Sequence, residues 1–160
     1  MHIEIRPYQD SDRDVVVSAL IDFQNLELAL HDTRLPGSTT LCANYLDMVL
    51  PYVAEQDGAF CTAHLDGVFV GFCAYYIKED TNPIETPDSN RHGYVQDIYV
   101  IPEYRGRNIA AQMIDHARNY FRVLGMKRMR INVLAGNDAA RRAYEKAGFE
   151  KYEVMYEAKL

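Results

Sequence analysis

The sequence predicts a single α/β domain, and three observations carry this prediction. Short segments with the apolar–polar alternation of strands are interspersed with longer segments whose apolar residues recur at helical spacing. The length of 160 residues corresponds to about one domain. The hydrophobic share of 48% and the charged share of 25% are those of a globular chain, which excludes disordered and fibrous proteins. We therefore expect residues 1–160 to form one domain in the order β-α-α-β-β-β-α-β-α-β.

The first half of the chain predicts a strand, two helices and a β-hairpin. Alternation before Pro7 indicates the strand, and acidic capping residues followed by apolar residues at helical spacing indicate the first helix. Pro51 is expected to kink or split the second helix, because it lacks an N–H and clashes with the preceding turn. Asp66 and Gly67 between two β-rich runs are typical of a hairpin turn. The expected elements are a strand at 2–6, helices at 11–30 and 39–56, and strands at 59–65 and 68–77.

The second half predicts three strands that alternate with two helices. Residues 79–92 are polar and contain two prolines, which indicates a mobile loop before the first of these strands. Gly125 and Gly148 each stand where a helix is expected to end. The expected elements are a strand from 93 that Pro102 halts, a helix at 109–124, a strand at 127–133, a helix at 137–147 and a last strand at 149–158.

Charge is distributed unevenly along the chain. The formal net charge is −6, but residues 1–100 carry −11 and residues 101–160 carry +5. Such asymmetry is typical of a protein with one part that meets an anion and another that meets a cation. Solvated surface is the alternative interpretation.

The cysteines and the N-terminus predict a soluble, cytoplasmic protein. Cys42, Cys61 and Cys73 are odd in number and lie far apart, which argues against a disulfide framework or a structural zinc site. The first residues show no signal peptide, and no apolar run reaches the length of a membrane span. The histidines show no metal-ligand spacing, so no metal is expected at His2, His31, His64, His92 or His116.

A candidate anion site follows the strand that ends at Pro102. A turn containing Arg105, Gly106, Arg107 and Asn108 leads directly into a helix, whose first N–H groups and positive dipole end attract anions. Glycine lets the backbone approach a ligand closely, and asparagine tolerates a positive φ. The turn is neither a Walker loop nor a dinucleotide fingerprint. An ordinary β-α turn is the alternative interpretation.

The last predicted helix carries a second pattern. Asn137 stands at its start as a cap, and Ala140, Tyr144 and Ala147 share one helical face. The small alanines allow the helix to lie close to whatever it covers, and Tyr144 supplies a polar tip. A core tyrosine is the alternative interpretation.

Together these two patterns resemble the GNAT superfamily of acyl-CoA N-acyltransferases. The phosphate-binding signature of that family corresponds to residues 105–110, with Asn108 where the family usually has glycine. The later block of the family corresponds to Asn137, Ala140, Tyr144, Gly148 and Phe149. The resemblance implies an α/β GNAT-like fold with a mixed central sheet of about six or seven strands and about four helices. It also implies acetyl-CoA as cosubstrate.

The resemblance also implies where acetyl-CoA is held. The pantetheine arm would lie along the strand before the turn like an added strand, and the backbone amides of the turn would hold the pyrophosphate. Arg107, Arg141, Arg142 and Lys146 remain alternatives for the nucleotide phosphates. The residues assigned to cofactor binding are Ile98, Tyr99, Val100, Arg105, Gly106, Arg107, Asn108, Ile109, Ala110, Asn132, Asn137, Ala140 and Lys146.

The implied reaction needs two proton transfers. An ammonium group must lose a proton before it attacks, and the departing thiolate must gain one. The resemblance makes Tyr144 the general acid. The base stays open among Asp97, Gln96 and Tyr94, because glutamine can only orient a water molecule and strand alternation can aim Asp97 away from the acceptor. Cys73 is interpreted as a buried apolar residue, which favours direct transfer in a ternary complex.

The predicted function is acetyl-CoA-dependent N-acetylation of a primary amine on a small molecule. An enzyme that acts on protein N-termini or lysines is the alternative within the class, and a catalytically silent acyl-CoA-binding module is the alternative from another class. No nucleic-acid or membrane partner is expected. A monomer and a homodimer both remain open.

The acidic part of the chain predicts a cationic acceptor. The resemblance places the first helix and the 79–92 loop around the acceptor opening, where a negative rim would concentrate cations. The carboxylates in these segments are Asp22, Glu27, Asp32, Glu79, Asp80, Glu85 and Asp88.

Overall fold

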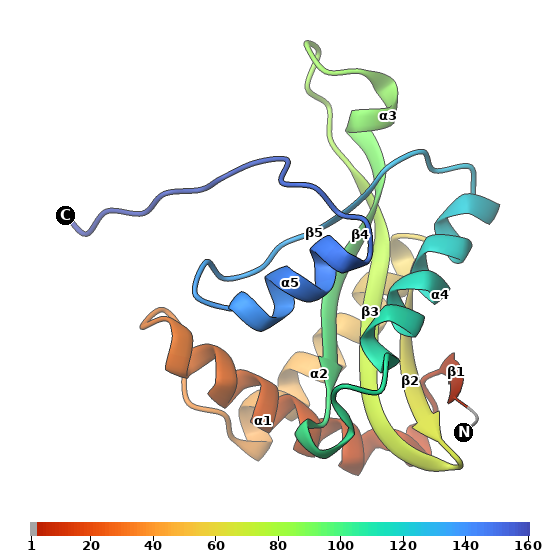
Figure 1. The fold of residues 1–160 in the computed structure, drawn as a ribbon, viewed down its shortest axis with the longest axis vertical. Helices are drawn as coiled ribbons and strands as arrows, with labels where there is room; N and C mark the ends of the chain where they lie inside the picture. The colour runs from red at the N-terminus through yellow and green to blue at the C-terminus, as the bar shows by residue number, and fades with distance from the viewer. Residues whose placement is uncertain (1–2) are drawn as a thin grey trace.

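One five-stranded sheet organises residues 3–160, the part of the chain that the computed structural model describes (Figure 1). The strands follow the spatial order β1-β2-β3-β4-β5. Neighbours from β1 to β4 are antiparallel, and β5 is parallel to β4. The strands are β1 (Ile3–Pro7), β2 (Ala59–Leu65), β3 (Val68–Glu79), β4 (Arg91–Val100) and β5 (Met129–Ile131).

Helices cover both faces of this sheet, and each face has its own apolar cluster. Buried side chains of α1 and α2 pack on one face, around Phe72 and Tyr99. Buried side chains of α4 pack on the opposite face, around Val95 and Val100. The helices are α1 (Arg13–Leu30), α2 (Thr39–Glu55), α3 (Pro87–Asn90), α4 (Ile109–Val123) and α5 (Asp138–Lys146), with 3-10 turns at Asp10–Asp12 and Pro102–Tyr104.

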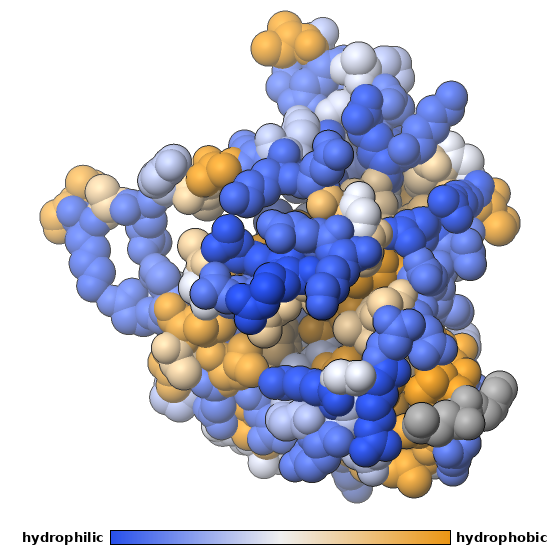
Figure 2. Space-filling view, viewed as in Figure 1, coloured by the Kyte–Doolittle hydropathy of each residue, from blue (hydrophilic) through white to orange (hydrophobic). Residues whose placement is uncertain are grey.

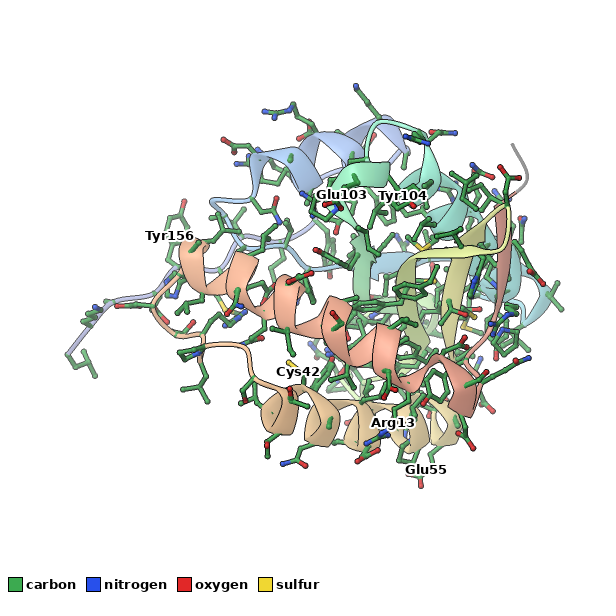
Figure 3. All side chains as sticks on the ribbon, turned by 90° about the horizontal axis from the view of Figure 1, so that it is seen from below. Arg13, Cys42, Glu55, Glu103, Tyr104 and Tyr156 are labelled. Carbon is green, nitrogen blue, oxygen red and sulfur yellow. The ribbon has the colours of Figure 1, made fainter. Side chains whose placement is uncertain are left out.

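Helices α1 and α2 contact each other on one face of the sheet. Arg13 of α1 reaches Asp47 of α2 through two hydrogen bonds of 2.7 and 2.9 Å. Arg13 lies at one end of the paired helices, and Cys42 lies near α1 in Figure 3. Cys42 is buried, with 2% of its surface exposed, so the two helices are in close contact.

Turn and cap residues behave as the sequence predicts. Asp66 and Gly67 have φ values of 49° and 84°, as a two-residue hairpin turn requires. Gly125 and Gly148 adopt φ values of 77° and 87° just beyond α4 and α5, where a helix end favours glycine. The hairpin and both helix ends are therefore confirmed.

Two expectations for α2 and the 79–92 segment are corrected. Helix α2 continues through Pro51, so the expected split does not occur, because Leu46, Val49 and Val53 on either side of it are buried in the core; the alternative of a kink stays a prediction. The segment expected as a loop contains the short helix α3 and joins β4 at residue 91. The first strand begins at Ile3, since His2 lies outside the described residues.

The strand predicted at 149–158 does not form, so residues 3–160 contain five strands rather than six or seven, with five helices rather than four. Alternation is present in this segment, but no described strand pairs with it. The apolar side chains of Tyr152, Val154 and Tyr156 consequently remain 63%, 63% and 92% exposed. A strand needs a neighbour for its backbone hydrogen bonds as well as an alternating sequence.

Candidate active site

A β-bulge in β4 decides which side chains face α1 and α2. Ala74 of β3 pairs with Asp97, whereas the next residue of β3, Tyr75, pairs with Val95. Gln96 is therefore the extra residue of the bulge. Strict alternation would place Asp97 and Tyr94 on opposite faces, because they are three positions apart. The bulge changes this parity and brings both to the α1–α2 face.

Asp97 is a buried carboxyl group with an altered proton affinity. Only 9% of the residue is exposed, and the hydroxyl of Tyr45 donates a hydrogen bond to its Oδ2 atom. Burial raises the pKa of Asp97 from 3.8 to about 6, the hydrogen bond from Tyr45 opposes that rise, and the negative charge of Glu27 adds to it. A carboxylate with a pKa near 6 is ionised at neutral pH and still accepts a proton readily, as a general base must.

Tyr144 of α5 lies in the same electrostatic environment as Asp97. Burial raises the pKa of Tyr144 to about 12, and the charges of Glu27 and Asp97 contribute to that rise. Its ring packs edge-on against Phe149, with the ring centroids 6.0 Å apart. The phenol therefore stays protonated at neutral pH and is able to donate a proton.

The backbone of β4 beyond the bulge has an open edge. The N–H of Ile101 donates to Val70 O of β3 at 2.9 Å, so the backbone groups of Val100 and Ile98 point the other way. β5 pairs only with residues 93–95 of β4, and no described strand continues along this edge. An extended ligand can therefore form strand-like hydrogen bonds with the backbone of Ile98 and with the N–H of Val100, whose carbonyl oxygen already accepts a hydrogen bond from Arg105 Nε.

Tyr99, unlike Ile98 and Val100, does not direct its backbone groups to the open edge of β4. Its side chain is 5% exposed and packs against Phe23 and Phe72 on the α1 face. Its backbone, at the intermediate position, points toward β3. Among the three predicted strand residues, the open edge thus uses Ile98 and Val100 and not Tyr99.

The turn between β4 and α4 has the backbone conformation of an anion-binding loop. Gly106 and Asn108 have φ values of 76° and 63°, and Asn108 stands in the left-handed region directly before α4. No cap hydrogen bond comes from its side chain. The first N–H groups of α4, at Ile109 and Ala110, are left without intrahelical partners. The expected left-handed conformation of Asn108 is confirmed.

The arginines of this turn are held by aromatic rings. Arg105 lies over the ring of Tyr99 at 5.5 Å, and its Nε atom donates to Val100 O at 3.0 Å. Arg107 lies over the ring of Tyr104 at 5.4 Å. In Figure 3 the turn that carries Glu103 and Tyr104 bridges β4 and α4. The N–H of Arg105 already donates to Pro102 O at 3.2 Å, so the free amides begin after it.

The remaining predicted residues belong to β5 and α5. Asn137 caps α5, since its side chain accepts a hydrogen bond of 3.1 Å from Ala140 N. Asn132 follows β5 and is exposed, as is Lys146 in the last turn of α5. Hydrophilic side chains cover α5 in Figure 2, in the middle of the face shown. Arg141 is engaged with Ala135 O and Asp138, whereas Arg142 and Lys146 are exposed.

Two residues of the site escaped the sequence analysis in their structural roles. Tyr45 of α2 was not recognised, and Glu27 of α1 was placed only in an acidic rim. Both act on Asp97 across distances of 52 and 70 positions in the sequence. Packing of α1 and α2 on the sheet brings both residues to β4. This proximity leaves no local pattern in the sequence, so neither residue belongs to a motif. The spacing of Tyr45 next to the buried residues Cys42, Leu46 and Val49 predicts only that it lies at the border of the apolar face of α2.

Most of the proposed acidic rim is already paired with cations of the same chain. Asp32 meets Lys159 at 2.6 Å, Glu27 meets Arg34 at 2.8 Å and Asp88 meets Arg128 at 2.8 Å. Glu79 likewise meets Arg91 at 2.8 Å. The rim therefore carries less uncompensated charge than the sequence suggests.

Cys73 belongs to the apolar cluster on the α4 face of the sheet. Within residues 3–160, no group of three or more His, Cys, Asp and Glu side chains is arranged to hold a metal ion. Cys73 is 1% exposed, in agreement with a packed apolar residue. No helix in the same residues is long and apolar enough to cross a bilayer.

Curated relatives share part of this sequence. An uncharacterised N-acetyltransferase of Methanocaldococcus jannaschii is 31% identical over 101 residues, which cover 63% of this chain and 42% of the relative. An aminoglycoside N(6′)-acetyltransferase type 1 of Salmonella typhimurium is 28% identical over 91 residues, which cover 57% of this chain and 61% of the relative. The chain thus spans less than two thirds of the length of either relative.

Solved structures share the fold, and a family model covers the site. A predicted acetyltransferase of Clostridium acetobutylicum, solved with acetyl-CoA, superposes with a TM-score of 0.72 at 19% identity, over 99% of this chain and 96% of that one. The model of the acetyltransferase (GNAT) family matches residues 25–149, which include the β4 bulge, the β4–α4 turn and α5. This chain therefore belongs to the acetyltransferase (GNAT) family.

Proposed function

We propose that this protein transfers an acetyl group from acetyl-CoA to the primary amine of a small cationic molecule. The observation that supports the proposal is that Asp97 of β4 lies near enough to Tyr144 of α5 for its charge to raise the pKa of the phenol, on a strand whose edge is open beyond residue 95. One group is poised to accept a proton and the other to donate one. The acetyl thioester would lie where the open edge meets these two side chains.

The reaction is a direct transfer within a ternary complex. The ammonium group of the acceptor first gives a proton to the Asp97 carboxylate, directly or through a water molecule held by Gln96. The neutral amine then attacks the thioester carbonyl carbon, so that a C–N bond forms and the C–S bond breaks. Tyr144 donates its proton to the departing thiolate, which leaves as CoA, and the second proton that the acylated nitrogen loses returns to the Tyr144 phenolate.

The chain holds acetyl-CoA with its backbone more than with charged side chains. Ile98 and Val100 would pair with the pantetheine arm along the open edge of β4. The N–H groups from Gly106 to Ala110, together with the positive end of α4, would hold the pyrophosphate. Arg142 and Lys146 on α5 remain exposed and available for the nucleotide phosphates.

The proposed acceptor class rests on the carboxylates around the site and on the relatives. Glu27 and Asp97 both contribute negative charge where the acceptor amine must arrive. The aminoglycoside acetyltransferase of Salmonella typhimurium is named for a polycationic acceptor. A protein N-terminus or lysine is the second candidate within the same chemistry.

The test is release of free CoA from acetyl-CoA in the presence of a panel of amines. The panel contains polyamines, aminoglycosides, simple monoamines and basic peptides. Turnover that is faster with the small polycations supports the proposal. Preference for the peptides assigns the chain to protein acetylation, and the absence of turnover with every amine, despite bound acetyl-CoA, identifies a silent binding module.

A further inference from the structure

A tyrosine from α2 reaches the proposed base from a distant part of the chain. Tyr45 lies 52 positions before Asp97, and its hydroxyl donates to the Oδ2 atom of that carboxyl group. The register shift at Gln96 turns Asp97 toward α2 and makes this contact possible. One carboxylate oxygen is thus engaged by the protein, which leaves Oδ1 to meet a ligand.

Four elements direct titratable groups toward Asp97. Glu27 comes from α1, Tyr45 from α2, Tyr94 from β4 itself and Tyr144 from α5. Burial and the charge of Glu27 favour the protonated form of Asp97, and both therefore raise its pKa. The hydrogen bond from Tyr45 acts in the opposite direction and favours the carboxylate.

We propose that Tyr45 is a positioning residue of this site, which fixes the Asp97 carboxylate so that its second oxygen faces the incoming ammonium group. This inference rests on the proposed function, because it assigns to Asp97 the proton that the acceptor must lose. Tyr45 does not touch the reacting atoms. It acts through Asp97 alone, by orienting it and by stabilising its ionised form.

The chemistry of tyrosine suits this task. Burial and the neighbouring charge of Asp97 raise the pKa of Tyr45 well above its usual value, so its hydroxyl stays protonated and remains a donor throughout the working pH range. The Gln96 side chain interacts with the same hydroxyl. Glu27 forms an ion pair with Arg34, in which Nε and Oε2 are 2.8 Å apart, rather than a hydrogen bond with Tyr45 or Asp97.

The experiment compares Tyr45→Phe with the wild-type protein in two independent measurements. The first is kcat/KM as a function of pH, with an amine from the panel above that gives turnover. The second is the titration of the Asp97 carboxyl carbon by NMR in the protein without substrates, with Asp97→Asn to assign the signal. Tyr52→Phe is the matched control, because Tyr52 also lies on α2 but packs its ring against Tyr76 at 5.1 Å.

Loss of the Tyr45 hydroxyl should raise the pKa of Asp97 by about one unit. The acid limb of the kcat/KM profile should move to higher pH by the same amount, while the Tyr52→Phe profile stays with the wild type. An unchanged Asp97 titration in folded Tyr45→Phe protein overturns the inference. If the titration moves but Asp97→Asn retains full turnover, the contact is real and the assignment of Asp97 as base in the proposed function is wrong.

Discussion

At the scale of single residues, the chemistry depends on a carboxyl group that the fold keeps out of water. A buried carboxylate is unstable relative to its protonated form, and this raises the pKa of Asp97 to about 6. The same property that makes Asp97 a useful base makes it costly for the folded state at neutral pH. Function and stability therefore make opposite demands on this position.

Replacement of Asp97 by asparagine should reveal this cost. Since the folded-state pKa lies above the unfolded value, the wild-type protein loses stability as pH rises from about 4 through about 6. Asp97→Asn removes this titration and should raise the free energy of unfolding at pH 8 by at most about 3 kcal/mol. The thermal midpoint should therefore rise at pH 8 and change little at pH 4. Glu150→Gln, which removes an exposed carboxylate after α5, is the control, and an equal or lower midpoint for Asp97→Asn at pH 8 contradicts the prediction.

Replacement of Tyr144 by phenylalanine tests the proton donor. Without the hydroxyl the thiolate leaves unprotonated, so kcat should fall by roughly 10²–10⁴ while the dissociation constant of CoA changes little. Tyr152→Phe, at a residue that is 63% exposed, should leave kcat unchanged. If kcat of Tyr144→Phe stays within a few-fold when chemistry is rate-limiting, Tyr144 is a packing residue only.

At the scale of elements, one turn and one bulge place the chemistry. The turn before α4 has a positive φ at Asn108, and asparagine tolerates this conformation better than other non-glycine residues. The bulge at Gln96 needs no special residue type. It shifts the alternation of side chains in β4 by one residue, so that Tyr94 and Asp97 point to the same face of the sheet.

The turn can be tested with two substitutions at Asn108. Asn108→Gly should bind CoA as well as or better than the wild type, because glycine adopts the same backbone conformation without strain. Asn108→Val should bind CoA more weakly, because a β-branched side chain resists a positive φ. Isothermal titration with CoA measures both constants, and equal constants for the two variants would show that this backbone conformation is not needed for binding.

At the scale of the whole molecule, the charge asymmetry has a narrower meaning than the sequence suggests. The basic last 60 residues include the proposed cradle for a polyanionic cosubstrate. Several acidic residues of the first 100 are engaged in ion pairs, among them Asp32 with Lys159 and Glu79 with Arg91. A cationic acceptor is then attracted mainly by Asp97 at the site, since the charge of Glu27 is partly compensated by Arg34.

This steering should appear in the salt dependence of turnover. For matched amines of charge +1, +2 and +3, kcat/KM should increase with charge at low ionic strength, and the increase should diminish as salt is added. Potassium chloride titration with sodium acetate as a second salt separates screening from a specific ion effect. Equal values for the three amines at low salt would mean that the acidic residues are surface charge without a part in capture.

The sequence by itself determined the elements whose signals are local. The hairpin turn at Asp66 and Gly67, the helix ends at Gly125 and Gly148, the cap at Asn137 and the left-handed Asn108 all depend on the backbone preferences of one or two residues. Each could be predicted because it does not depend on residues that are distant in the sequence. The family resemblance is likewise contained in two short segments of the second half.

Only the tertiary structure decided the features that need a distant partner. Alternation at 149–158 did not produce a strand, because no neighbouring strand supplied backbone hydrogen bonds. Pro51 did not split α2, because buried residues on both sides hold the helix against the sheet. Asp97 was already one of the candidate bases in the sequence, but its facing was decided by a bulge that alternation cannot foresee. Its proton affinity was decided by burial and by Tyr45 and Glu27, which reach it from two other helices. The burial of an atom and the charges near it depend on every element packed around it. No single segment of the sequence contains this information.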